Sequence, residues 1–200
     1  MQPHDNQTLS FYECEAFSYA KNTSHSPGRR LGRFLDNLSP GASVLELGCG
    51  GGRDTKEMME RGFAVTPTDG SPAMAAEAAR RLGCEVKTLL FEDISAIEQY
   101  DAVWANACLL HVPLFALSGI LCLIRCALRP GGSFYASYKS GLAEGRDSLG
   151  RYYNDPSLLE LRDIYQFATS WKSIEIESDN GPGYDNRPTK WLHATASKRN

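Results

Sequence analysis

A glycine-rich stretch that follows a short apolar run limits the possible folds of this chain more than any other feature. Residues 44–54 read Val-Leu-Glu-Leu-Gly-Cys-Gly-Gly-Gly-Arg-Asp. The apolar run is too short for a helix, so it predicts a buried strand, and the glycines allow the backbone to turn sharply against a ligand. Residues 55–61 are helix-forming, so the turn is expected to lead into a helix N-terminus. The pattern predicts a nucleotide-type loop.

The spacing of the glycines indicates which nucleotide this loop binds. A dinucleotide fingerprint of the form GxGxxG needs a third glycine at position 53, where this chain has Arg53. The chain instead carries Glu46-x-Gly48-x-Gly50-x-Gly52. This pattern resembles the glycine-rich loop of the class I S-adenosylmethionine (SAM)-dependent methyltransferases.

Three further features extend this resemblance over residues 40–140. Asp69 closes the next predicted strand, residues 64–68, and Phe91-Glu92-Asp93-Ile94 follows a third strand. Leu128-Arg129-Pro130-Gly131-Gly132 then precedes another apolar strand. The resemblance implies an α/β fold: a Rossmann-like, seven-stranded, mostly parallel sheet with helices on both faces and an antiparallel C-terminal strand pair.

The resemblance also implies roles for individual residues. Gly48 and Gly50 would let the backbone approach the cofactor, Glu46 would orient its ammonium group, and Asp69 would accept from the ribose hydroxyls. Asp93 and the Ile94 N–H would contact adenine. The expected cofactor site comprises Tyr12, Tyr19, Glu46, Gly48, Cys49, Gly50, Arg53, Asp69, Gly70, Ser71, Met74, Phe91, Glu92, Asp93, Ile94 and Asn106.

Several of these residues also have a simpler interpretation. Asp69 precedes a predicted helix N-terminus, where any acid is favourable. Met74 and Phe91 are equally compatible with the core. Arg53 either reaches the cofactor carboxylate or lies solvated on the first helical turn.

Alternating strand and helix patterns organise the rest of the chain. Ser71 and Pro72 predict an N-cap and first position of a helix that ends before Gly83. The remaining predicted helices cover residues 29–38, 111–128 and 157–168, the last capped by Asp155-Pro156. Predicted strands cover residues 85–89, 100–105, 133–138, 173–177 and 190–197, and a Gly/Pro/Asn-rich loop joins the last two. This alternation favours a largely parallel sheet.

The N-terminal segment, residues 1–28, contains a predicted helix over residues 9–20 with aromatic side chains. The resemblance implies that this helix is a lid, because many small-molecule methyltransferases close their cofactor site with such a helix. The alternative is that Phe11, Tyr12, Phe17 and Tyr19 simply pack the helix onto the domain.

Residues 140–155 predict an irregular insertion on the substrate side of the sheet. Its segment Gly-Arg-Asp-x-x-Gly-Arg-Tyr-Tyr is similar to segments of tellurite-resistance and trans-aconitate methyltransferase-like proteins. Arg146 and Arg151 would pair with an anionic acceptor, or else form a solvated loop with Asp147 and Glu144. The expected substrate residues are His111, Tyr138, Arg146, Arg151 and Tyr152.

His111 is the candidate catalytic residue, because an imidazole can serve as a general base near neutral pH. The alternative role for His111 is to start the helix that follows. Methyl transfer from a sulfonium needs positioning more than a catalytic group, so no triad is expected.

Composition limits the class of protein and its partners. The 200 residues predict one domain, residues 1–200, and the net charge of −3 gives no general attraction for nucleic acid or anionic lipid. The sequence Asn106-Ala107-Cys108-Leu109 also lacks the Pro-Pro pair of amino-methylating DNA enzymes. Six scattered cysteines without a CxxC pair predict free thiols and no metal site. No leader or membrane segment is expected.

These observations predict a cytoplasmic methyltransferase, a monomer or homodimer, that acts on a small molecule with SAM as cofactor. Two alternatives belong to other classes. A SAM-binding sensor or partner subunit without turnover would keep the same loop. A nicotinamide-dependent oxidoreductase would share the sheet, although Arg53 argues against it.

Overall fold

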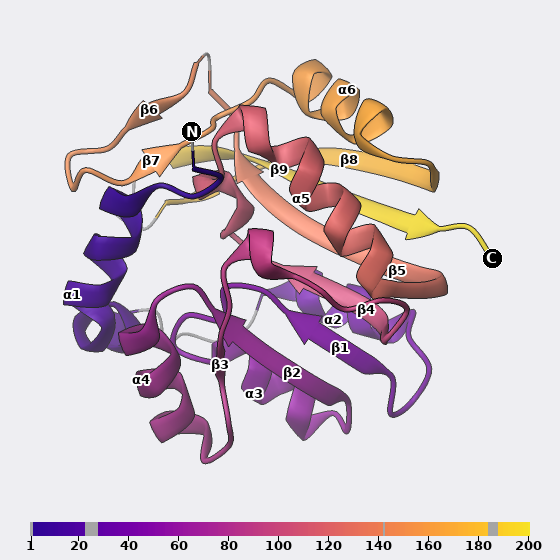
Figure 1. Cartoon of the computed structure of the whole chain (residues 1–200), viewed down its shortest axis with the longest axis horizontal. Helices are drawn as coiled ribbons and strands as arrows, with labels where there is room; N and C mark the ends of the chain where they lie inside the picture. Colours follow the sequence, from indigo (N-terminus) through magenta and orange to yellow (C-terminus); the bar gives the residue numbers. More distant parts are fainter. Residues whose placement is uncertain (1, 23–27, 142, 184–187) are drawn as a thin grey trace.

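A seven-stranded sheet in the order β3-β2-β1-β4-β5-β9-β8 runs through the described part of the chain in the computed structural model (Figure 1). The structure describes residues 2–22, 28–141, 143–183 and 188–200. The strands are β1 (Ser43–Glu46), β2 (Ala64–Asp69), β3 (Lys87–Thr88), β4 (Tyr100–Ala105), β5 (Leu128–Lys139), β8 (Trp171–Pro182) and β9 (Pro188–Lys198). Strands β1 to β5 pair in parallel, whereas β9 is antiparallel to both β5 and β8. The predicted fold class is confirmed.

Helices lie on both faces of this sheet. They are α1 (Asn6–Asn22), α2 (Arg29–Asp36), α3 (Arg53–Glu60), α4 (Pro72–Leu82), α5 (Leu114–Ala127) and α6 (Leu158–Ala168), with short 3₁₀ turns η1 (Phe91–Asp93) and η2 (Leu109–His111). Helices α5 and α6 cover one face, and α2 and α3 cover the other. Helix α1 lies beside α4 (Figure 1).

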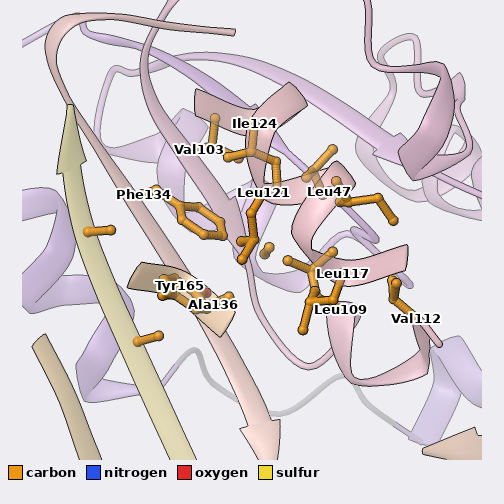
Figure 2. Packing of buried hydrophobic residues seen from close by; sticks show 14 of the residues in the cluster. Leu47, Val103, Leu109, Val112, Leu117, Leu121, Ile124, Phe134, Ala136 and Tyr165 are labelled. Atoms are coloured by element: carbon orange, nitrogen blue, oxygen red, sulfur yellow. The ribbon is translucent and has the colours of Figure 1, made fainter. Parts of the chain in front are cut away.

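Each face of the sheet has its own apolar cluster. On the α5 side, Leu121 and Ile124 pack against Val103 and Phe134 of the central strands (Figure 2). On the α2 side, Phe34 packs against Trp104 and Tyr135, whose rings stack with centroids 4.1 Å apart. Burial on both faces explains why the parallel strands read as continuous apolar runs.

The signals at the ends of α4 act as predicted. The Ser71 side chain accepts a hydrogen bond from the Met74 N–H at 3.1 Å, and Pro72 occupies the first helical position. Gly83 ends the helix with a φ of +68°, a left-handed conformation that glycine adopts without strain. Short-range chemistry therefore fixes both ends of this helix.

The predicted starts of two helices were wrong. Helix α5 begins at Leu114 and not at residue 111, because Pro113 restricts Val112 to an extended conformation. Helix α6 is capped by Ser157, which accepts from the Glu160 N–H while Glu160 accepts from the Ser157 N–H. The predicted cap at Asp155 and Pro156 lies before this capping box.

The strands also differ in length from the prediction. Strand β3 is only Lys87–Thr88, whereas β5 begins at Leu128 and contains Pro130-Gly131-Gly132 within an irregularity of its pairing with β4. Strands β8 and β9 extend beyond the predicted runs because they pair with each other along most of their length. The predicted loop between them includes residues 184–187, which lie outside the described residues.

The segment over residues 140–155 is more regular than predicted. Strands β6 (Gly145–Arg146) and β7 (Tyr152–Tyr153) pair as an antiparallel hairpin. The hairpin lies beside α1, since the Tyr152 N–H donates to the Thr8 hydroxyl at 2.8 Å. Residue 142 of this segment lies outside the described residues.

Candidate functional site

A cavity of ≈ 460 Å³ opens at the carboxyl ends of the parallel strands, where the strand order reverses between β1 and β4. Such a reversal leaves a crevice in an open α/β sheet, and the volume suits a small-molecule ligand. The predicted residues that line it are Tyr12, Tyr19, Glu46, Gly48, Cys49, Gly50, Arg53, Asp69, Gly70, Met74, Phe91, Asn106 and His111. Tertiary folding therefore brings most of the predicted cofactor residues to one cavity.

The glycine loop forms the floor of the cavity between β1 and α3. Gly48 has a φ of +63°, and a Cβ atom added there would lie 2.5 Å from Cβ of Cys108. Gly52 has a φ of +80° and serves as the N-cap of α3. Only glycine fits the Gly48 position, because Cys108 fills the space that a Cβ atom would occupy.

Asp69 ends β2 and receives backbone N–H groups from the loops on either side of it. Its Oδ2 accepts from the Gly50 N–H and its Oδ1 from the Ser71 N–H, each at 3.0 Å. Burial raises the pKa of Asp69 to about 6, although these N–H groups oppose the shift. Each carboxylate oxygen keeps a further lone pair, so Asp69 can still accept hydrogen bonds from a diol.

Glu46 ends β1 and is only 2% exposed. The Thr55 hydroxyl donates to its Oε2 atom. Burial, together with the nearby Asp54 carboxylate, raises the pKa of Glu46 to about 8. A buried carboxylate that is this costly to ionise favours a cationic ligand beside it.

Asp54, at the start of α3, is satisfied by three donors. Its carboxylate accepts from the Trp104 Nε1–H at 2.9 Å, from the Asn106 amide at 3.1 Å and from Arg53 Nε–H at 2.7 Å. The Ser137 hydroxyl donates to the Asn106 Oδ1 at 2.8 Å. This network fixes Asn106 and holds Arg53 at the cavity wall.

Helix α1 contributes part of the cavity wall opposite the loop. Tyr12 and Tyr19 contact each other edge to face, with ring centroids 5.1 Å apart, and both line the cavity. Glu13 joins α1 to α4, since it accepts from the Ser71 hydroxyl at 2.6 Å and from the Ala73 N–H at 3.0 Å. The predicted lid over residues 1–28 includes residues 1 and 23–27, which lie outside the described residues.

His111 lies between α1 and the β6–β7 hairpin. Its Nδ1 donates to the Tyr152 carbonyl oxygen at 2.6 Å, which leaves Nε2 to accept from the Tyr12 hydroxyl at 2.9 Å. Burial lowers the pKa of His111 to about 4, so the ring is neutral at pH 7. His111 is therefore a hydrogen-bond acceptor toward the cavity.

The other predicted substrate residues do not line the cavity. The hydroxyl of Tyr138 is buried against that of Tyr165, 3.0 Å away, and the Tyr152 hydroxyl donates to Glu144. Arg146 pairs with Asp5 at 2.6 Å, and Arg151 pairs with Asp147 at 2.7 Å. Both arginines hold the hairpin together or bind it to α1.

The segment after β3 is only partly directed toward the cavity. Phe91 lines the cavity, whereas Asp93 is exposed and lines a separate hollow beside α1 and α4 with Ser71. Glu92 bonds His4, and the Ile94 N–H donates to the Phe91 carbonyl at 3.4 Å. The adenine contacts predicted for Asp93 and Ile94 stay predictions.

Sequence reasoning missed one end of the cavity altogether. Arg30 of α2, Asp179 of β8, and Trp191 and His193 of β9 line it. The two-residue period of β9 places Trp191 and His193 on one face, but no local signal places that face beside the glycine loop. The sheet order β4-β5-β9 decides it.

No group of three or more His, Cys, Asp or Glu side chains among the described residues is arranged to hold a metal ion. None of their helices is long and apolar enough to span a bilayer.

The sheet order and the cavity define a Rossmann-like α/β protein with a nucleotide-type site at its switch point. A family model described as a methyltransferase domain matches residues 44–132. The chain is 33% identical to an uncharacterized methyltransferase from Synechocystis over 150 residues, which are 72% of this chain and 66% of that protein. The chain therefore matches a methyltransferase domain over residues 44–132 and has the Rossmann-like fold of methyltransferases.

A second curated relative is the ubiquinone biosynthesis O-methyltransferase of Xanthomonas campestris pv. campestris. It is 34% identical over 110 residues, which are 49% of this chain and 43% of that protein. The chain thus matches less than half of the length of this relative.

Solved structures share the fold at lower identity. Burkholderia thailandensis 1,6-didemethyltoxoflavin-N1-methyltransferase, determined with 1,6-didemethyltoxoflavin and S-adenosylhomocysteine, has a TM-score of 0.77 and 24% identity, and the match covers 100% of this chain and 92% of that one. Haemonchus contortus phosphoethanolamine N-methyltransferase 2, determined with S-adenosylmethionine, has a TM-score of 0.78 and 17% identity. The match covers 98% of this chain and 60% of that one.

Proposed function

We propose that this chain transfers a methyl group from SAM to a small-molecule acceptor by in-line displacement. The observation that carries this proposal is that the backbone of Gly48, the buried carboxylate of Glu46 and the carboxylate of Asp69 face one cavity at the switch point. A zwitterionic nucleoside with a diol fits this donor and acceptor set. Solved structures with this fold were determined with SAM or S-adenosylhomocysteine.

The charges of the cavity suit the amino-acid part of SAM. Glu46 would hold the ammonium group, because its carboxylate is buried and, among the described residues, only the Thr55 hydroxyl donates to it. Arg53 would hold the carboxylate, since only its Nε is engaged by Asp54, and its Nη groups make no hydrogen bond with the described residues. Gly50 and Cys49 lie between these two groups and Asp69.

The other end of the cavity suits the adenosyl part. Asp69 would accept from the ribose hydroxyls, and Met74, Phe91 and Gly70 would border the base. Tyr12 and Tyr19 of α1 would cover the cofactor, which is the predicted lid function of residues 1–28. The sulfonium supplies the methyl group and its activation, and the protein supplies orientation and exclusion of water.

His111 would take the proton from the hydroxyl or amine group of the methyl acceptor. Its ring is neutral, and Nε2 holds the Tyr12 hydroxyl as its proton donor. An acceptor group that replaces the Tyr12 hydroxyl, or that donates to the Tyr12 oxygen, would be within reach of this nitrogen. We therefore keep His111 as the proposed general base.

The subfamily, the oligomeric state, the charge of the methyl acceptor and the cellular location are further parts of the proposal. The resemblance of residues 145–153 to tellurite-resistance and trans-aconitate methyltransferase-like proteins remains a hypothesis, as does the monomer or homodimer. The ion pairs of Arg146 and Arg151 give no support to an anionic acceptor. Six free cysteines support the proposed cytoplasmic location.

Calorimetric titration of the protein with SAM and with S-adenosylhomocysteine tests the proposal. We expect saturable binding of both at one site per chain. A folded protein that binds neither would contradict the proposal. A sensor or partner subunit without turnover would bind both but transfer no radiolabelled methyl group to any compound of a broad acceptor panel.

A further inference from the structure

The cavity continues well beyond the glycine loop, across the C-terminal half of the sheet. Residues from β8 and β9 line it as well as residues from the loop after β1. In the sheet order, β8 lies four strand positions from β1, which corresponds to roughly 19 Å at about 4.8 Å per strand. A ligand bound at the glycine loop therefore does not fill this end of the cavity, and a second molecule can bind there.

We call this end the far lobe and define it by Arg30, Ser137, Asp179, Asn180, Trp191 and His193. Its charged groups are already paired. The guanidinium of Arg30 donates to Glu177 at 2.7 Å and to Asp179 at 3.3 Å, so two carboxylates share one cation. The far lobe has no unpaired cation for an anionic ligand.

His193 provides a hydrogen-bond donor in the far lobe. The Tyr135 hydroxyl lies 2.8 Å from Nδ1 of His193, and we assign it as the donor because a phenol hydroxyl is the stronger donor and an imidazole nitrogen the stronger acceptor of the pair. Burial and Arg30 lower the pKa of His193 to about 4, so the ring is neutral with its proton on Nε2. That Nε2–H has no partner among the described residues.

Trp191 provides an apolar surface whose polar atom is already engaged. Its Nε1–H donates to the Pro182 carbonyl at 3.3 Å. Its ring packs on Gly181, where an added Cβ would lie 3.4 Å from Cδ1 of the ring. The half-buried indole therefore offers a fixed aromatic surface for stacking.

From these contacts, and resting on the proposed function, we infer that the far lobe binds the methyl acceptor and that this acceptor is an uncharged, planar ring compound. The indole of Trp191 stacks on the ring, and the Nε2–H of His193 donates to a carbonyl oxygen or ring nitrogen on its edge. A carboxylated analogue binds less well, because Asp179 and Glu177 leave no spare positive charge.

Calorimetry at pH 7 with saturating S-adenosylhomocysteine tests this inference. The probes are lumazine and 2-quinolone, neutral planar rings that each carry a carbonyl oxygen, and each is compared with its carboxylated analogue, lumazine-6-carboxylate or 2-quinolone-4-carboxylate. We expect at least one neutral probe to bind, and its carboxylated analogue to bind about tenfold or more weakly. Trp191→Ala and His193→Phe should each lower the affinity for the neutral probe by about tenfold. This is the scale of a lost stacking contact or hydrogen bond.

Thr195→Ala is the matched control, because Thr195 lies on the same face of β9 but outside the cavity lining. It should leave probe binding unchanged. Trp191→Phe, which keeps an aromatic ring, should retain part of the affinity, and a melting curve for each variant shows whether it is folded.

Three outcomes would overturn the inference: no neutral probe binds, the carboxylated probes bind at least as tightly, or the folded Trp191 and His193 variants bind the neutral probe as well as the wild type does. The dissociation constant of S-adenosylhomocysteine should stay within about twofold in every variant. Failure of the wild type to bind S-adenosylhomocysteine would instead contradict the proposed function, so the two failures are distinguishable.

Discussion

Gly48 and Glu46 show how single residues make the cavity. Gly48 needs both a left-handed backbone and empty space, whereas Gly41, with a φ of +74°, has nothing within 4 Å of an added Cβ. Glu46 provides a carboxylate whose burial raises its pKa to about 8. The Gly48 prediction separates backbone strain from steric collision, and the Glu46 prediction separates stability from cofactor affinity.

Gly48→Ala should destabilise the protein more than Gly41→Ala does. Alanine in a left-handed conformation costs about 1–2 kcal/mol, and the collision with Cys108 adds roughly 1–3 kcal/mol only at position 48. Urea unfolding of both variants measures the difference. Equal losses of stability would show that Cys108 moves aside without cost.

Glu46→Gln should change how the stability of the ligand-free protein depends on pH. The pKa of Glu46 is raised from its ordinary value of 4.5 to about 8 in the folded state. The wild type therefore keeps its full stability with respect to this group below pH 4.5 and loses stability as the pH rises toward 8. By pH 7 this loss is on the order of 3 kcal/mol, because the group ionises in the unfolded chain while it stays protonated in the folded protein.

Glutamine keeps an acceptor for the Thr55 hydroxyl but does not titrate, so this decline should be absent from the variant. Unfolding curves at several pH values compare the wild type with Glu46→Gln, and Glu60→Gln, at an exposed position, is the control. SAM affinity should nevertheless fall in Glu46→Gln, because the ammonium partner is lost. Parallel pH curves for wild type and variant would contradict the raised pKa.

At the scale of elements, α1 connects the two halves of the site. Its N-terminal end contacts the β6–β7 hairpin through Asp5 and Thr8, and its middle contacts the start of α4 through Glu13. Both contacts are polar, and Thr8 and Ser71 are buried, so these hydrogen bonds hold α1 in place.

Glu13→Ala should loosen α1 without unfolding the protein. It removes the acceptor for the Ser71 hydroxyl and the Ala73 N–H, which corresponds to about 0.5–1.5 kcal/mol per hydrogen bond. Hydrogen exchange in α1 and dissociation of S-adenosylhomocysteine should both become faster. Glu15→Ala, at another exposed position of α1, is the control; identical behaviour of the two variants would remove the proposed role of Glu13.

At the scale of the whole molecule, the sheet joins the cofactor end and the far lobe in one structure. If residues 1–200 form one domain, as predicted, heat should unfold the chain in a single transition. Ligand binding should then raise the melting temperature of the entire chain, because the cavity takes side chains from both halves of the sheet.

S-adenosylhomocysteine at 100 times its dissociation constant should stabilise the protein by about 2.7 kcal/mol, which raises the melting temperature by roughly 5–11 °C. NADH should give no shift, since Arg53 occupies the third glycine position of the dinucleotide fingerprint. Differential scanning calorimetry measures both. A shift with NADH alone would revive the oxidoreductase hypothesis, and two separate transitions would contradict the single domain.

The sequence by itself determined the features that depend on neighbouring residues. The strand and glycine loop at residues 44–52, the caps of α4 and the alternation of strands with helices follow from local sterics and periodicity, and they led to the correct fold class. Pro113 could have given the start of α5, because a proline restricts the residue before it.

Only the tertiary structure decided which distant groups share the cavity. Arg146 and Arg151 turned out to be ion-paired outside it, while Trp191 and His193, more than 130 positions after the glycine loop, line it. The physical reason is that both depend on contacts between residues far apart in the chain. The ion-pair partners of a side chain and the position of β9 between β5 and β8 are set by such contacts, which local sequence patterns do not encode.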